Sequence, residues 1–351
     1  MQNFTEPSAN SVPTRQAYAD GLQAAIGLLR ADAAARKRAW ISPAQLAADP
    51  ERYRAAYRDL LGIPTCERVF GTGAPAVTET PVGTDDLCTI ARLVFTLAPG
   101  VCFTGLLLRP LHEPVVDPMP LVVTQHGGGG TPELCSDMVG KNNYNHMVRR
   151  VLARGATAFA PQLLLWNCGA QNNPGIPHFD PVYDRSKVNL SLRQCGTSIV
   201  GFEIYAISRA LDYLLAHEPV RPDRCGMIGI SYGGYYTLHA MAAEERITAG
   251  YSAAIFNDRL RYNWHDMVWR DSAAHFLDAE VAGLCAPRHL WIEVGKTDPV
   301  FDWTSIPAVF DEAQSYYDAQ SVPDAIHLNL WDGGHTITDT DDGMDFLFAH
   351  I

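Results

Sequence analysis

Hydrophobic positions near the start of the chain recur at a helical spacing. Leu22, Ile26 and Leu29 lie among many alanines and predict a helix over residues 14–39. A Ser-Pro pair then fits the N-cap and first position of a second helix, which a Gly-Ile-Pro sequence ends. We therefore expect residues 1–75 to form a helical extension packed on a larger core.

From about residue 76 the pattern changes to short apolar runs. Residues 91–97 and 101–108 flank a Pro-Gly turn and predict an antiparallel pair of strands. Strands and helices then alternate to the end of the chain, which predicts a mostly parallel sheet with helices on both faces. The expected fold class is therefore α/β, with residues 76–351 as one domain. The further predicted strands are 121–124, 156–160, 225–230, 250–255, 289–294 and 326–330, and the predicted helices are 145–154, 197–217, 235–243, 311–320 and 341–350.

Two segments interrupt this alternation. Residues 161–196 are rich in Asn, Pro and Gly, and residues 257–287 carry several aromatic residues and histidines. Long insertions after strands usually shape a binding site. Trp264 and Trp269 are candidates for lining a substrate cleft, because aromatic faces stack on sugar rings or pack acyl groups. Packing within a cap is the equal alternative for both.

The most specific motif is Gly-Ile-Ser-Tyr-Gly-Gly at residues 229–234. It follows an apolar run and precedes a helical segment, which is the context in which G-x-S-x-G indicates a nucleophile elbow. Glycine at positions 229 and 233 removes side chains that would clash in so sharp a turn. The helix that follows directs its free N–H groups at the reacting centre. Ser231 is therefore the predicted nucleophile.

A serine hydroxyl needs a base, and the base needs a carboxylate that orients it. His335 follows the last predicted strand on a glycine-containing loop, and Asp298 follows the strand before it. The chain order Ser231, Asp298, His335 is the order of an α/β-hydrolase triad, and each residue lies just beyond a strand, where such sheets bind ligands. Asp302 is the main alternative to Asp298, and Glu293 is a weaker one.

An acyl-transfer site also needs donors for the oxyanion. His126 and four glycines follow the strand 121–124, and this side-chain-free backbone can direct N–H groups at a tetrahedral intermediate. Gly128 is the expected donor, Gly127 is the alternative, and the backbone N–H of Tyr232 is the second donor. His126 is expected to support the loop. A phosphate cradle is disfavoured, because neither a P-loop nor a dinucleotide motif is present.

Composition and charge narrow the function further. The net charge of −12 argues against nucleic-acid and membrane partners. The eight cysteines are scattered without a C-x-x-C pair, which favours reduced thiols and a cytoplasmic protein. Neither a signal peptide nor an 18-residue apolar span is present in the sequence. No metal-ligand motif stands out, so no metal and no cofactor are expected.

The run from Asp223 to Gly234, with Ala210–Leu214 before it, resembles the α/β-hydrolase superfamily, in its dienelactone-hydrolase-like and acetyl-xylan-esterase-like serine esterase branch. The resemblance covers about residues 76–351 and implies cleavage of carboxylic esters, including acetylated sugars. The chain departs from true dienelactone hydrolases, which have cysteine at the elbow. The lack of a signal peptide moves the expected substrate from intact extracellular xylan to a small acylated metabolite or oligosaccharide.

We therefore expect a serine carboxylic-ester hydrolase that forms an acyl-enzyme on Ser231 and acts on a small-molecule ester, with an acylated carbohydrate as one candidate. A serine peptidase of the same superfamily is the nearest alternative, although an extension of about 75 residues does not supply a peptide-selecting propeller. A non-catalytic binding protein on this scaffold is a further alternative. The sequence leaves the oligomeric state open, with a homo-oligomer among the candidates.

Overall fold

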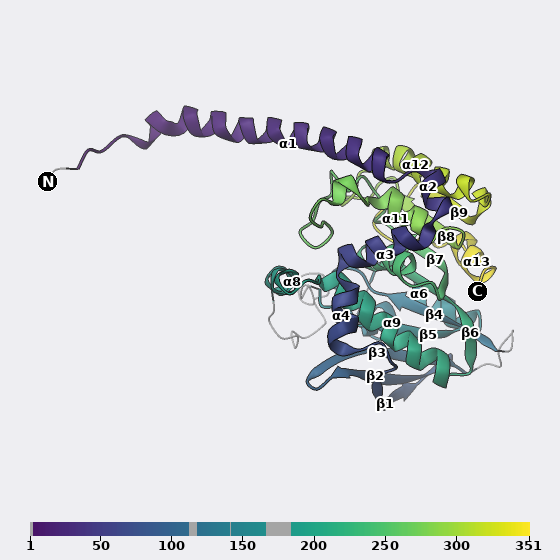
Figure 1. The fold of residues 1–351 in the computed structure, drawn as a ribbon. Coiled ribbons are helices and arrows are strands. Elements are labelled where there is room, and N and C mark those ends of the chain that lie inside the picture. The colour runs from purple at the N-terminus through teal and green to yellow at the C-terminus, as the bar shows by residue number, and fades with distance from the viewer. Residues whose placement is uncertain (1–2, 112–117, 141, 166–183) are drawn as a thin grey trace.

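A single mixed sheet organises the chain (Figure 1). The computed structural model describes residues 3–111, 118–140, 142–165 and 184–351. In these residues the sheet has nine strands in the order β1-β2-β3-β5-β4-β6-β7-β8-β9. The pairs among β1, β2, β3 and β5 are antiparallel, and all other neighbours are parallel. The strands are β1 (Ala76–Thr84), β2 (Cys88–Ala98), β3 (Val101–Pro110), β4 (Met119–Gln125), β5 (Thr157–Pro161), β6 (Val220–Ile230), β7 (Ile247–Ala253), β8 (His289–Gly295) and β9 (Ile326–Trp331).

Helices cover both faces of this sheet, which confirms the predicted α/β class. One face carries α5 (Pro132–Cys135), α6 (Met147–Ala153) and α13 (Asp342–Phe348). The other carries α9 (Ile199–His217), α10 (Tyr232–Ala243), α11 (Asp278–Cys285) and α12 (Ile306–Ala319). The remaining helical elements are η1 (Ser8–Ser11), α1 (Val12–Trp40), α2 (Pro43–Ala48), α3 (Pro50–Leu61), α4 (Ile63–Phe70), α8 (Arg185–Gln194), η2 (Ser272–Ala274), η3 (Trp303–Ser305) and η4 (Pro323–Ala325).

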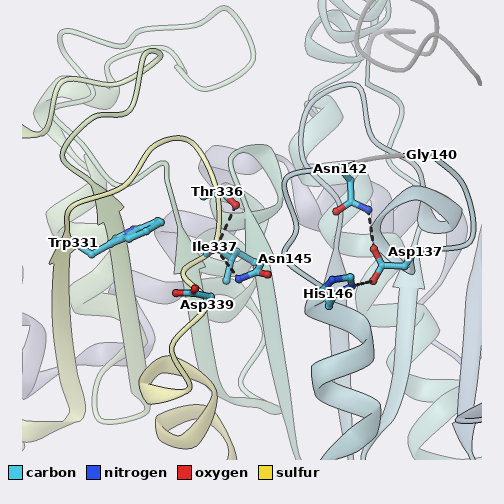
Figure 2. Close-up of a pocket in the computed structure, with 9 residues that line it drawn as sticks. All are labelled: Asp137, Gly140, Asn142, Asn145, His146, Trp331, Thr336, Ile337 and Asp339. Carbon is cyan, nitrogen blue, oxygen red and sulfur yellow. Dashed lines mark hydrogen bonds and ion pairs between the residues drawn. The ribbon is translucent and has the colours of Figure 1, made fainter.

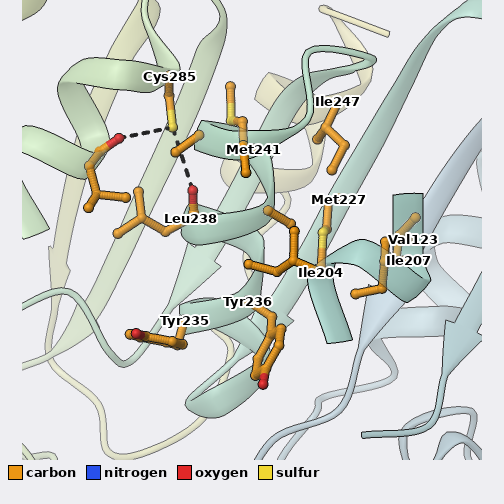
Figure 3. Packing of buried hydrophobic residues seen from close by; sticks show 14 of the residues in the cluster. Val123, Ile204, Ile207, Met227, Tyr235, Tyr236, Leu238, Met241, Ile247 and Cys285 are labelled. Atoms are coloured by element: carbon orange, nitrogen blue, oxygen red, sulfur yellow. Dashed lines mark hydrogen bonds between the residues drawn. The ribbon is translucent and has the colours of Figure 1, made fainter. Parts of the chain in front are cut away.

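Alternating residues of the parallel strands feed two separate cores. Val123 of β4 and Met227 of β6 pack on the α9 and α10 side with Ile204 (Figure 3). Their neighbours Val122 and Ile228 belong to the core on the opposite side. Successive side chains of a strand point to opposite faces. A strand buried on both faces therefore reads as a continuous apolar run.

The N-terminal region differs in detail from the prediction. The second predicted helix is two helices, α2 and α3, although its start and its end at Gly62 were placed correctly, and α4, which follows, was not predicted. Asp49 interrupts the predicted helix, because its side chain accepts the N–H of Arg52 and starts α3 anew. Gly62 ends α3 with a φ of 80°. Pro64 then lies in the first turn of α4, where its missing N–H costs no helical hydrogen bond.

Other predicted elements also differ from those in the structure. The first strand, β1, was not predicted as a separate strand. In the first insertion, residues 166–183 lie outside the described residues, and α8 occupies part of the remainder. The second insertion contains η2 and α11. Among the described residues, every helix is too short or too polar to cross a membrane.

Candidate active site

The turn between β6 and α10 places Ser231 in a strained backbone conformation. Its φ is 56° and its ψ is −123°, a combination that costs free energy for a residue with a side chain. A Cβ at Gly229 would lie 2.4 Å from the carbonyl carbon of Gly233. A Cβ at Gly233 would lie 2.1 Å from the carbonyl oxygen of Gln125. The close approach of the backbone, rather than flexibility, therefore requires both glycines of the motif.

His335 and Asp298 form a pair on neighbouring loops. Nδ1 of His335 lies 2.7 Å from Oδ2 of Asp298, whose side chain is fully buried. The other carboxylate oxygen, Oδ1, accepts the backbone N–H groups of Val300 and Phe301. These bonds fix the carboxylate, so that it can orient the imidazole.

The two alternative carboxylates serve other contacts. Oδ1 of Asp302 accepts the N–H of Thr304, at the start of η3, and its Oδ2 pairs with Arg261 at 2.8 Å. Glu293 is buried in β8, where it accepts the backbone N–H of Thr338 at 2.8 Å. Burial raises the pKa of Glu293 above its usual value. Neither of the two is paired with the imidazole, and Glu293 instead anchors the loop that carries it.

Ser231 and His335 line the same cavity, which has a volume of about 360 Å³. The predicted glycine loop forms one wall of this cavity. Gly127, Gly128 and Gly129 all lie in the lining. A Cβ at Gly127 would lie 3.3 Å from Cβ of Ser231. The loop therefore lies next to the serine.

His126 lies behind this loop and does not line the cavity. It is fully buried, with Nδ1 2.9 Å from the carbonyl oxygen of Gly127, and Nε2 accepts the N–H of Leu163 at 3.0 Å. This pattern assigns the proton to Nδ1. Burial lowers the pKa of His126 to about 4. The side chain therefore supports the loop as a neutral imidazole.

Tyr144 is a cavity residue that the sequence analysis did not find. Its hydroxyl accepts the backbone N–H of Gly127 at 3.0 Å. This contact engages the N–H of Gly127, which favours Gly128 as the oxyanion donor. The adjacent Asn143 donates to the carbonyl oxygen of His335 at 2.9 Å. The segment before α6 therefore holds both the glycine loop and the histidine loop, and no motif in the sequence marks it.

Trp264 and Trp269 lie in different places. Trp264 stacks on Tyr232 with ring centroids 5.5 Å apart, and it contacts Phe301 in a tilted arrangement at the same separation. The ring of Phe301 lies 5.8 Å from that of His335, so Trp264 belongs to a stack of rings beside the site. Trp269 is half-buried near α9 and α10, with its ring 5.9 Å from that of His239. Neither tryptophan lines the cavity of Ser231.

A buried ionic network lies behind the elbow. Nε of Arg185 lies 2.6 Å from Asp266, and Nη1 lies 3.3 Å from Glu203. The hydroxyl of Tyr232 donates to Asp266 at 3.0 Å, and Tyr236 bonds to Glu203. The network ties both insertions to the residue that follows the elbow serine. Apart from Tyr232, its members are far apart in the chain and carry no motif, so sequence reasoning did not identify them.

A second cavity of about 540 Å³ shares Asn142 with the first (Figure 2). Trp331 and Asp339 lie on one side of it, and Asp137 and His146 on the other (Figure 2). Asp137 is held by His146 at 3.0 Å and by Nδ2 of Asn142 at 2.8 Å. The second cavity therefore combines one aromatic face with several polar groups close to the histidine loop.

A metal centre was not expected from the sequence. Within the part of the chain that the structure describes, no group of three or more His, Cys, Asp or Glu side chains could hold an ion.

Comparisons with known proteins agree with this architecture. The model of the prolyl oligopeptidase family, Peptidase_S9, matches residues 203–280, which include the elbow. The Bacillus subtilis (strain 168) protein named "Putative hydrolase YtaP" is 28% identical over 149 residues, which are 40% of this chain and 50% of that protein. The match thus spans about half the length of this curated relative.

Solved structures share the fold over most of the chain. A "putative acetyl xylan esterase" from Bacteroides fragilis NCTC 9343 has a TM-score of 0.65 and 16% identity, and the match covers 83% of this chain and 77% of that one. Acetyl xylan esterase 1 from Thermoanaerobacterium sp. JW/SL YS485 has a TM-score of 0.57 and 15% identity, with 86% and 93% covered. These identities show the shared fold alone. The chain therefore has the fold that these α/β-hydrolase structures share.

Proposed function

We propose that the protein is a serine carboxylic-ester hydrolase with Ser231 as nucleophile, His335 as general base and Asp298 as the orienting carboxylate. The observation that carries the proposal is the cavity that Ser231 and His335 line together, with His335 paired to a buried carboxylate. Together with the pairing of His335 and Asp298, this supplies candidates for the three roles that acyl transfer requires.

In the first half of the reaction, Nε2 of His335 takes the proton of Ser231 as Oγ attacks the ester carbonyl. The tetrahedral intermediate then expels the alcohol, which receives this proton from His335, and an acyl-enzyme remains. In the second half, His335 takes a proton from water as the water oxygen attacks the acyl group. The tetrahedral intermediate then breaks its bond to Oγ of Ser231, which receives this proton from His335, and the acid is released. Asp298 accepts the Nδ1–H bond throughout and holds Nε2 toward the serine.

Two backbone N–H groups would stabilise the oxyanion. Tyr232 is the first residue of α10 and directly follows Ser231, so its backbone N–H is the first proposed donor. Gly128 lies in the opposite wall of the cavity, next to Gly127, whose N–H is already engaged by Tyr144. Each such donor contributes roughly 3–4 kcal/mol to the transition state.

The two cavities suggest which part of an ester substrate each of them binds. The cavity of Ser231, about 360 Å³ in volume, suits a small acyl group. The second cavity offers the ring of Trp331 together with Asp137 and Asn145, which suits a hydroxyl-rich alcohol such as a sugar. The fold shared with proteins named acetyl xylan esterases supports the same substrate class. We therefore propose an acetylated sugar as the substrate.

The test is a substrate panel with Ser231→Ala as the blank. The panel contains p-nitrophenyl esters from acetate to octanoate, acetylated xylo-oligosaccharides and a peptide amide. We expect Ser231-dependent release of acetate from the first and second groups, with activity falling as the acyl chain lengthens. Turnover of the amide alone would instead support a peptidase, the alternative that the prolyl oligopeptidase match favours. A folded protein that turns over nothing would contradict both and favour a binding role.

The sugar assignment has its own test. Trp331→Ala removes the aromatic face of the second cavity, and Trp331 is not among the residues that line the Ser231 cavity. We expect KM for an acetylated xylo-oligosaccharide to rise about tenfold, while the kinetics with p-nitrophenyl acetate stay unchanged. Equal effects on both substrates would contradict a sugar subsite.

The cellular setting belongs to the same proposal. Seven cysteines in the described residues are free thiols, and five of them are buried. Reduced cysteines of this kind favour a cytoplasmic enzyme.

A further inference from the structure

The N-terminal part of α1 extends away from the rest of the molecule (Figure 1). Hydrogen bonds from the helix to the body begin at Arg30, which donates to the carbonyl oxygen of Leu260 at 2.9 Å. Ala33 is the one buried residue of α1. Residues 12–29 precede these contacts, and at 1.5 Å per residue they span about 27 Å. We call this segment the arm.

The composition of the arm is unusual for a surface helix. Residues 17–29 contain a single charged residue, Asp20. Five large apolar side chains are exposed there, to between 41% and 76% of their surface: Tyr18, Leu22, Ile26, Leu28 and Leu29. A helix normally turns a charged face to solvent. Gly21 and Gly27 further disfavour an isolated helix. The arm therefore has the character of a helix that another surface covers.

We propose that a second copy of this chain covers the arm, with the two arms packed antiparallel. Tyr18, Leu22 and Ile26 are spaced four residues apart and share one face of the helix. Reversal about Leu22 places Tyr18 against the partner subunit's Ile26, and Leu22 against the partner subunit's Leu22. This self-complementarity is what a two-fold symmetric interface requires.

This register also fits the space around the arm. It pairs Thr14 with the partner subunit's Arg30, so the two arms overlap only before the body begins. A membrane surface is a poorer occupant, because residues 17–29 hold no Lys or Arg and the chain has a net charge of −12. Two arms form a small interface beside the 1,200–2,000 Å² or so that stable complexes bury. The dimer is therefore expected to dissociate on dilution.

The test is sedimentation equilibrium of the full chain over a range of concentrations. We expect the wild type to approach twice its 38.5 kDa mass at high concentration. The variant Leu22→Glu/Ile26→Glu places charges in the proposed interface and should sediment as a monomer. The matched control Ala24→Glu/Ala31→Glu adds the same charge on the opposite face, where both residues are exposed, and should still dimerise.

Two further readouts keep the result unambiguous. Far-UV circular dichroism should lose helical signal only in the Leu22→Glu/Ile26→Glu variant, because the uncovered arm is a poor helix. Activity on p-nitrophenyl acetate should be the same in all three proteins, because the arm contributes nothing to the cavity of Ser231. A wild type that stays at 38.5 kDa at every concentration, or a Leu22→Glu/Ile26→Glu variant that still dimerises, would overturn the proposal. Co-sedimentation of a monomeric wild type with phosphatidylglycerol vesicles would overturn it in favour of a membrane.

Discussion

Nδ1 of His335 lies 2.7 Å from Oδ2 of Asp298, although the two residues are 37 positions apart in the chain. The carboxylate has no exposed surface, and its other oxygen is held by two backbone N–H groups. The imidazole therefore meets a fixed acceptor, which selects the tautomer with a proton on Nδ1.

The first prediction concerns this pair. In Asp298→Asn the amide can donate to Nδ1, which favours the wrong tautomer, so we expect kcat to fall about 10⁴-fold with the fold intact. The comparison is Asp302→Asn, which should change kcat less than tenfold, because Asp302 starts η3 and asparagine is an equally good N-cap. Ester hydrolysis and a thermal melt of both variants provide the check. Near-normal activity in Asp298→Asn would remove that residue from the proposed triad.

The second prediction concerns the glycine loop. A Cβ at Gly127 would lie 2.8 Å from the carbonyl oxygen of Ile230 and 3.3 Å from Cβ of Ser231. Gly127→Ala should therefore displace the loop from the elbow and lower kcat by about 10²-fold or more. In the control Gly83→Ala the new methyl group meets no atom within 4 Å. Esterase assays at saturating substrate measure both, and an unchanged kcat in Gly127→Ala would contradict the role of the loop.

The third prediction concerns the buried ionic network. Arg185→Leu leaves Asp266 and Glu203 without their buried cationic partner, so we expect the free energy of unfolding to fall by about 3–5 kcal/mol. Arg92 forms a more exposed pair with Glu133, and Arg92→Leu should cost about 0–1 kcal/mol. Urea denaturation of the two variants tests the contrast. Equal losses would show that the network adds no stability beyond that of a surface pair.

The fourth prediction concerns pH. Burial lowers the pKa of His126 to about 4 from a usual 6.5. Between these two pH values, the imidazole is mostly protonated in the unfolded chain and mostly neutral in the folded chain. The contribution of neutral His126 to the free energy of unfolding is fully present above pH 6.5. It is lost as the pH falls, and the loss is about 3 kcal/mol at pH 4. In His126→Gln this share of the pH dependence should disappear. Unfolding free energies at pH 7 and pH 4 measure it, and parallel losses in both proteins would refute the assignment.

Much of the architecture follows from local patterns in the sequence. The buried parts of β4, β6 and β8 contain short apolar runs, at residues 121–123, 225–230 and 290–292, because both faces of the sheet are covered, and such runs are visible without a structure. The elbow is equally visible as a motif. Only glycine fits at position 233, because a Cβ there would lie 2.1 Å from the carbonyl oxygen of Gln125. The chain order of Ser231, Asp298 and His335 was also available in advance.

The break of the second predicted helix at Asp49 was missed, although Asp49-Pro50 repeats the pattern of an N-cap followed by proline that Ser42-Pro43 shows. The apolar stripe of α1 is different, because its environment is not visible in the sequence. The spacing of its apolar residues predicts a helix. Only the structure shows that the N-terminal part of this helix extends away from the rest of the molecule.

The sequence by itself therefore determined the fold class, the elbow and the candidates for base and acid, because each depends on residues close together in the chain. Tertiary structure alone decided which carboxylate meets His335, that Tyr144 engages the N–H of Gly127, and that Arg185 is paired behind the elbow. These contacts join residues 17 to 81 positions apart. No local spacing rule links such residues, because only the packing of strands and loops brings them together.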